Sequence, residues 1–531
     1  MRPAIFAFAG VLLIASCFLD LHRGLWTPDE PREAGISREM YTHPAVIPTL
    51  NGEPFVEKPP LYYWATALSF SIVGGPSVAA ARSVSGISGL LTLTVLFVWV
   101  RRARSVATAA VATVLLATFA AFLTGVHWVR IDALLLLFCT ISIWSAWERL
   151  GRGARPGFLV LFYAGIVLAL WTKGLIGPVL IGAGLALYAA FSRSFKVLMP
   201  LRPFAGTTVL VAAVATLAAA IRVSGGPAAL STWFWVNHVE RFVHPVATGH
   251  EHSFAYYAWT LPAAIAPWLV PFAALFRWKG PLFARDRADA ALLRFAAAMT
   301  IAPLAVLSLA SSKREVYLLP LLPALALLMA TSVEDRIEAE ASTPRPGAWT
   351  RFGDWLQAAI LGLIGLAPAA WHVVTSRAVT PVSAILGLAG LASAVALGVA
   401  VVRRELRRAF WIGAASMAVA FAGVATLVVP KVDAIKNMQP FIAGIDALLP
   451  ARAPLPAIGA DETLLGIVPF VTGRKVLPVD AKALDGAAFV LVQWHGEDAN
   501  PDALSPAYER IASSEFGPSR RLALWRKRAA P

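Results

Sequence analysis

Acidic and basic side chains are crowded into one polar segment between two apolar stretches near the start of the chain. The segment opens with Trp-Thr-Pro-Asp-Glu-Pro-Arg-Glu at 26–33 and closes with Glu-Lys-Pro-Pro-Leu-Tyr-Tyr-Trp at 57–64. Six ionisable groups therefore lie beside an apolar span: Asp29, Glu30, Arg32, Glu33, Glu57 and Lys58. Proline and tryptophan residues restrict the geometry of these groups. The pattern indicates chemistry on a lipid headgroup at a membrane surface.

Asp29 is the first candidate for a chemical role. It follows the first apolar stretch, and Arg32 lies one helical turn further on. A carboxylate that an arginine keeps ionised and oriented can act as a general base, which typically contributes about 10²–10⁴ in rate. The simpler alternative is that Asp29 caps a helix running through Met40, with Arg32 as its partner. Glu30 is a second candidate for the base.

Lys58 is the second candidate, because Pro59 and Pro60 stiffen the chain beside it. A rigidly held ammonium suits a phosphate, and the alternative is a lysine that merely reaches to the membrane interface. Glu57 could bind a metal or simply pair with Lys58. The run His-Glu-His at 250–252 could supply ligands to a divalent metal ion, or make ordinary hydrogen bonds.

Composition identifies the class of protein. The chain has 531 residues, of which 58% are hydrophobic and 15% charged, whereas soluble domains carry about 25% charged residues. The mean hydropathy is +0.67. The net charge of +15 comes from arginine and lysine clusters between apolar stretches, as the positive-inside rule describes for cytoplasmic loops. Such dispersed charge disfavours nucleic-acid binding and predicts a polytopic membrane protein.

Apolar windows of about 20 residues predict the membrane spans. We expect about thirteen transmembrane helices, at 3–21, 83–100, 106–124, 131–149, 157–172, 175–191, 204–222, 256–276, 292–311, 316–333, 356–374, 381–402 and 409–429. The shorter segment 60–75 is expected to be an interfacial helix.

With a cytoplasmic N-terminus, this plan divides the chain into two domains. Residues 1–429 form a transmembrane domain with outer loops at 22–82 and 223–255. Residues 430–531 are Pro-punctuated and β-rich, which predicts a small α/β domain outside the membrane. The isolated basic residues at span ends then face the same outer side as Asp29. They are either topology anchors or a binding site for a lipid-linked phosphate, and they include Arg130, Lys173, Lys313 and Arg314.

Several motifs resemble those of a known family. They are Trp-x-Pro-Asp-Glu-x-Arg at 26–32, Ile-Ser-Arg-Glu-Met at 36–40 and Phe-x-Glu-Lys-Pro at 55–59, followed by Arg-x-Asp at 130–132, Thr-Lys-Gly at 172–174, His-x-x-Arg-Phe at 238–242 and Tyr-x-x-Pro-x-x-Pro at 317–323. Together they resemble the bacterial aminoarabinose transferases that modify lipid A. More broadly, they are similar to the protein O-mannosyltransferase-like superfamily of GT-C membrane glycosyltransferases.

The resemblance implies a transferase that uses a polyprenyl-phosphate-linked sugar. Asp29 would be the catalytic aspartate and Arg32 its partner, while Glu57 and His252 would hold a divalent metal ion. The donor phosphate would be bound by Lys58, Arg130, Lys173, Arg241, Lys313, Arg314 and Tyr317. Pro31 and Glu33 depart from the family pattern, which leaves the sugar and acceptor open.

The expected reaction is one displacement at the anomeric carbon, with inversion and departure of polyprenyl phosphate. A double displacement would need a second carboxylate, for which Glu57 is the candidate. The site and the C-terminal domain are expected on the periplasmic side of a bacterial inner membrane. The acceptor would be lipid A, another glycolipid or a secreted protein. The rival interpretations are a transporter or flippase of lipid-linked sugars and a non-enzymatic envelope scaffold.

Overall fold

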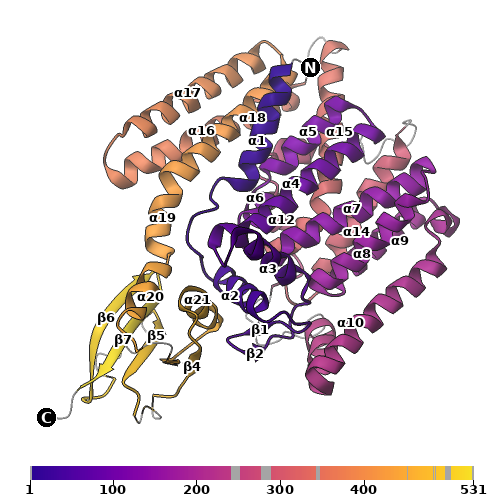
Figure 1. The fold of residues 1–531 in the computed structure, drawn as a ribbon. Helices are drawn as coiled ribbons and strands as arrows, with labels where there is room; N and C mark the ends of the chain where they lie inside the picture. The colour runs from indigo at the N-terminus through magenta and orange to yellow at the C-terminus, as the bar shows by residue number, and fades with distance from the viewer. Residues whose placement is uncertain are drawn as a thin grey trace.

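The computed structural model describes residues 3–240, 252–276, 289–342, 347–450, 453–481, 484, 486–496 and 504–528. Within these residues the protein consists of a body of long helices and a smaller region of helices and strands at one end of it (Figure 1). The segment that carries Asp29 lies at that same end.

The body is built from apolar helices, since backbone inside a membrane must satisfy its own hydrogen bonds. Many Ser and Thr hydroxyls in these helices donate to the carbonyl four residues earlier, as Thr140 does to Leu136 at 2.6 Å. The helices are α1 (Pro3–Phe18), α4 (Val78–Ala103), α5 (Val106–Thr118), α6 (Ala120–Val126), α7 (Ile131–Arg152), α8 (Gly157–Lys173), α9 (Ile176–Phe191), η1 (Phe195–Leu201), α10 (Pro203–Ser231), η2 (Thr232–Glu240), α12 (Tyr256–Ala264), α13 (Leu269–Ala274), α14 (Ala290–Leu309), η3 (Glu315–Leu321), α15 (Leu322–Ser342), α16 (Ala348–Ser376), α17 (Pro381–Val402), α18 (Leu406–Gly423) and η4 (Val424–Val428).

These helices make the protein a multi-pass membrane protein. Among the described residues, eight helices are long and apolar enough to span a membrane, or nine if the bent pair α5–α6 is one span. The number thirteen remains a prediction, because several expected spans are short or broken. For example, α8 and α9 have 17 and 16 residues, and the expected span at 256–276 is divided into α12 and α13.

The first outer segment contains α2 (Asp29–Thr42), the short strands β1 (Thr49–Leu50) and β2 (Glu53–Pro54), and α3 (Leu61–Val73). Pro28 occupies the N-cap of α2, so Asp29 is the first helical residue rather than its cap. Two prolines precede α3, which starts at Leu61. A helix was expected here at 60–75.

The C-terminal region follows α19 (Val429–Lys436) and contains two further helices and a mixed sheet. Its sheet has the order β4-β3-β5-β7-β6, with β4, β3 and β5 parallel and β5, β7 and β6 antiparallel. The elements are α20 (Gln439–Asp446), β3 (Leu455–Ile458), α21 (Glu462–Thr472), β4 (Val476–Pro478), β5 (Phe489–His495), β6 (Tyr508–Phe516) and β7 (Arg520–Lys527).

Helices α2 and α21 pack directly on each other. Ala34 and Ile36 of α2 share one buried apolar cluster with Leu464 and Ile467 of α21. The contact is close because glycines face each other, and a Cβ added to Gly35 would lie 2.6 Å from the Gly466 Cα. Figure 1 shows α21 beside α2, next to the sheet. The C-terminal region therefore supports the helix that carries Asp29.

Candidate active site

A pocket of about 280 Å³ collects the ionisable residues of the outer segment and of several helix ends. Five acidic and five basic side chains line it, together with Ile131, Ser312 and Tyr317. The acidic ones are Asp29, Glu33, Glu57, Asp132 and Glu462, and the basic ones are Arg32, Lys58, Arg130, Lys173 and Arg314. A larger cavity of about 880 Å³ lies among α13, α15, α16, α17 and α18, but its lining is mainly apolar. The smaller pocket is therefore the one that can do polar chemistry.

Asp29 stands at the junction of three arginines. Its Oδ2 is 2.6 Å from Arg314 Nη2 and 2.9 Å from Arg130 Nη2, and its Oδ1 is 3.3 Å from Arg32 Nη2. Burial alone would raise the pKa of Asp29, but the charges of Arg130, Arg314 and Arg32 outweigh it and lower the pKa well below its usual range. Asp29 is thus an ionised carboxylate of low basicity.

Arg32 connects Asp29 to two further carboxylates. It donates to Glu33 Oε1 at 2.7 Å and to Glu462 Oε2 at 2.7 Å. Glu33 is buried, and its Oε2 accepts a hydrogen bond from Tyr63 Oη at 2.7 Å. Glu462 is the first residue of α21 and follows the N-cap Asp461. The C-terminal region thereby contributes a side chain to the pocket.

Two lysines complete the basic lining. Lys58 Nζ lies 3.1 Å from Glu57 Oε2, just before the two prolines that lead into α3. Lys173, the last residue of α8, forms an ion pair with Asp132 in the first turn of α7. The ammonium of Lys173 also lies 4.6 Å from the centre of the Tyr317 ring. Both lysines sit where a phosphate in the pocket could compete for them.

The structure brings together eight of the eleven residues predicted for the site. They are Asp29, Arg32, Glu57, Lys58, Arg130, Lys173, Arg314 and Tyr317. Lys313 is not among the lining residues, because its ammonium donates to the carbonyl oxygens of Ala310 and His252. Arg241 lies outside the described residues.

The predicted metal ligands do not form a ligand set in the described part of the chain. Glu57 pairs with Lys58, whereas the His252 ring stacks on Tyr256 with centroids 4.2 Å apart and does not line the pocket. Within the described ranges, no group of three or more His, Cys, Asp or Glu side chains is placed to hold a metal ion. Residues 241–251, which include His250, lie outside those ranges.

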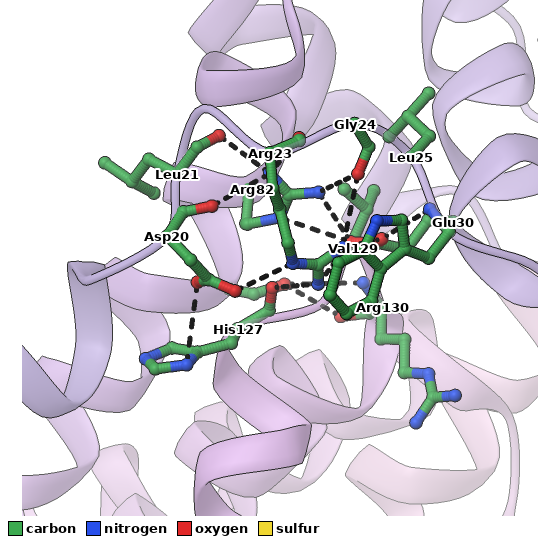
Figure 2. A network of polar contacts seen from close by, with 12 residues as sticks. Asp20, Leu21, Arg23, Gly24, Leu25, Glu30, Arg82, His127, Val129 and Arg130 are labelled. Carbon is green, nitrogen blue, oxygen red and sulfur yellow. Dashed lines mark hydrogen bonds and ion pairs between the residues drawn. The ribbon is translucent and has the colours of Figure 1, made fainter. Parts of the chain in front are cut away.

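Glu30, the second candidate for a base, does not line the pocket. Its side chain is fully buried and is held by Arg23 and Arg82 on the other side of the helix start (Figure 2). Conversely, Glu33 and Glu462 line the pocket but were not predicted as site residues, although Glu33 belongs to the crowded polar segment. A hint for Glu462 was available in the Asp-Glu pair that opens α21, but charged residues at helix starts are common.

Fold and site together define a multi-pass helical membrane protein with an ion-lined pocket at one end of its helical body. The family profile described as dolichyl-phosphate-mannose-protein mannosyltransferase matches residues 57–219, which include Lys58, Arg130 and Lys173. The crystal structure of ArnT from Cupriavidus metallidurans bound to undecaprenyl phosphate has the same fold, with a TM-score of 0.75 over 98% of this chain and 97% of that one, at 20% identity.

Sequence relatives agree with the fold. The chain is 30% identical over 326 residues to an undecaprenyl phosphate-alpha-4-amino-4-deoxy-L-arabinose arabinosyl transferase of Serratia proteamaculans, covering 60% of this chain and 57% of the relative. A protein of the same name from Erwinia tasmaniensis is 28% identical over 444 residues, covering 80% and 77%. The family profile and these relatives agree with the resemblance predicted from the motifs, and the chain spans about three fifths of the length of the curated relatives it matches first.

Proposed function

We propose that the protein is a glycosyltransferase that moves a sugar from a polyprenyl-phosphate donor to lipid A or another glycolipid. The observation that carries this proposal is the pocket in which an ionised Asp29, held by three arginines, lies beside Lys58 and Lys173. The relatives are named for an undecaprenyl-phosphate-linked aminoarabinose, and ArnT was crystallised with undecaprenyl phosphate. Both support a polyprenyl-phosphate donor for this chain.

The basic lining would bind the donor phosphate. Lys58 and Lys173 are compact cations on pocket walls contributed by different elements, and Tyr317 lies against Lys173. An arriving phosphate would take over part of the pairing that Glu57 and Asp132 now provide. Charge-assisted hydrogen bonds of this kind stabilise the phosphate as its negative charge grows in the transition state.

Asp29 would orient the acceptor hydroxyl. The acceptor oxygen attacks the anomeric carbon, the bond from that carbon to the phosphate oxygen breaks, and the configuration inverts. Because three arginines lower its pKa, Asp29 is too weak a base to keep the proton. The proton therefore ends on the released polyprenyl phosphate, while Asp29 holds the hydroxyl in line by accepting its hydrogen bond. A double displacement would instead use Glu57, which accepts a hydrogen bond from Lys58 at 3.1 Å.

We also propose where the protein lies in the cell and how its chain divides into domains. The pocket would face the periplasm from a bacterial inner membrane, with thirteen spans in residues 1–429 and a periplasmic α/β domain in residues 430–531. The arginine clusters between the apolar helices support this orientation through the positive-inside rule.

The test is mass spectrometry of envelope lipids and glycoproteins from cells that carry wild-type protein, Asp29→Asn protein or no protein. We expect a pentose- or hexose-sized mass increment on a glycolipid with the wild type, and a loss of at least about 100-fold with Asp29→Asn. Asp480→Asn, which changes an exposed aspartate outside the pocket, should behave as wild type. Identical profiles in all cells would refute the transferase, and an increment on secreted protein would reassign the acceptor.

A further inference from the structure

Glu30 is the centre of a buried polar network that Figure 2 shows from close by. Its Oε1 accepts from the backbone N–H of Val129 at 2.9 Å and from Arg82 Nη2 at 2.9 Å. Its Oε2 accepts from the backbone N–H of Trp26 at 2.9 Å and from Arg23 Nη1 at 2.5 Å. The Glu30 side chain is 0% exposed, and both of its oxygens accept hydrogen bonds from groups within the protein.

The two arginines extend this network to the surrounding backbone. Arg82, on α4, also donates to the carbonyl oxygens of Leu21 at 2.7 Å and Arg23 at 2.9 Å. Arg23 donates to the carbonyl oxygen of His127 at 3.0 Å. Buried charges are costly unless they are paired and hydrogen-bonded. This network therefore fixes the positions of three segments relative to one another: the loop that precedes α2, the helix α4, and the turn that precedes α7.

Two residues of this network are neighbours in the sequence of residues that line the pocket. Glu30 follows Asp29 directly, and Val129 precedes Arg130 directly. The hydrogen bond from Val129 to Glu30 therefore lies next to the 2.9 Å ion pair between Arg130 and Asp29. Trp128, whose ring centre is 4.4 Å from the Arg130 guanidinium carbon, belongs to the same turn.

We propose that Glu30 is a positioning residue, which fixes where Arg130 meets Asp29 by clamping the Val129 amide to the start of α2. A long arginine side chain could otherwise take many positions, and the clamp limits them by fixing its backbone. Small displacements of a catalytic pair have large effects on rate. The expected effect on turnover rests on the proposed transferase function, whereas the clamp itself does not.

Glu148 provides a matched control for the alternative that Glu30 only stabilises the fold. It is also 0% exposed and pairs with an arginine, accepting from Arg102 Nε at 2.7 Å and Nη2 at 2.9 Å. It lies towards the far end of α7, about 27 Å along the helix from Arg130 at 1.5 Å per residue. Glu148→Gln thus removes a similar buried charge far from the pocket.

The experiment compares full-length wild-type, Glu30→Gln, Glu30→Asp and Glu148→Gln proteins. Glu30→Asp keeps the charge that faces Arg23 and Arg82 but is one methylene shorter, so it should fold even if Glu30→Gln does not. Amide hydrogen exchange of peptides that cover 127–132 reports on the clamp. Turnover is measured per folded protein with undecaprenyl-phosphate-linked aminoarabinose and lipid A.

We expect both Glu30 variants to speed exchange in 127–132 at least about tenfold and to lower kcat about 10- to 100-fold, with KM changed less than about threefold. Glu148→Gln should leave both quantities at wild-type values. Wild-type exchange in Glu30→Asp, or wild-type kcat despite faster exchange, would overturn the positioning role. If wild-type protein transfers no sugar at all, the proposed function fails, and the exchange data still decide whether the clamp exists.

Discussion

Arg32 of α2 and Glu462 of α21 form an ion pair of 2.7 Å between positions 430 residues apart in the chain. The same guanidinium lies 3.3 Å from Asp29. One arginine thus joins the proposed catalytic carboxylate to the C-terminal region, so the pocket is a composite of the helical body and the region that follows it.

Glu462→Gln tests what this composite construction contributes. The Glu462 side chain is 51% exposed, and exposed ion pairs stabilise a fold by only about 0.2–1 kcal/mol. We therefore expect a change in unfolding free energy below about 1 kcal/mol, together with a rise of several-fold in KM because Arg32, which contacts Asp29, loses a partner that holds it in place. Thermal unfolding and steady-state kinetics measure the two effects. Glu509→Gln removes a partner of Arg526 outside the pocket. It should leave both the unfolding free energy and KM unchanged within experimental error.

Arg314→Gln tests the electrostatic control of Asp29. Removing the nearest arginine should let the pKa of Asp29 rise towards its usual range, and the acid limb of the kcat/KM profile should move to higher pH. Because the folded-state pKa of Asp29 is lowered, its ion pairs stabilise the protein above the unfolded-state pKa of about 3.9, and this stabilisation is lost as pH falls through the folded-state pKa.

The stability of Arg314→Gln should follow the same sign. We expect a deficit of about 1.5–3 kcal/mol at neutral pH, which shrinks as the pH falls below about 4. Arg474→Gln, which breaks an ion pair with Asp446 away from the pocket, should lower stability without moving the acid limb. An unmoved acid limb in Arg314→Gln would mean that Asp29 does not set it.

Lys58→Ala tests the donor-phosphate site. Hydrogen bonds to charged groups are worth about 1.5–3 kcal/mol, which corresponds to roughly a 10- to 100-fold weaker affinity. We expect this loss in a titration of the full-length protein with undecaprenyl phosphate. Lys431→Ala removes a lysine that donates to Thr375 and Ser376 outside the pocket, and it should bind as wild type. Equal affinities for wild type and Lys58→Ala would remove Lys58 from the phosphate site.

Gly466→Ala tests the contact between α2 and α21. A Cβ at this position would meet the Pro31 carbonyl oxygen at 2.2 Å, and overpacking of this kind costs about 1–3 kcal/mol. We expect a lower unfolding temperature and a loss of transfer activity, since Pro31 lies between Asp29 and Arg32. Gly444→Ala in α20 is the control, because a Cβ there has no neighbour within 4 Å. A wild-type unfolding temperature for Gly466→Ala would show that the two helices can separate at no cost.

The local parts of the site could be predicted from the sequence, because they depend on neighbours in the chain. Asp29 and Arg32 are three residues apart on one helix, and Lys58 is fixed by the prolines that follow it. The membrane class followed from composition alone. These signals do not require knowledge of how distant segments pack.

The remaining features depend on packing that the sequence does not display. Arg130 and Arg314 were predicted as phosphate ligands, but both are ion-paired with Asp29, in one case across 285 positions. Of the adjacent pair Lys313 and Arg314, only Arg314 points into the pocket, and that depends on the backbone direction before η3. Glu30 and Asp29 are neighbours of the same chemical type, yet the turn of α2 sends them to opposite sides.

The glycine contact between Gly35 and Gly466 has a consequence for the order in which the protein is made. Synthesis runs from the N-terminus, so α2 emerges more than 400 residues before the helix that covers its apolar face. A partly made chain would already carry every residue that lines the pocket except Glu462, while α2 is still unsupported. Under the proposed function, transfer activity would therefore begin only when synthesis has passed α21.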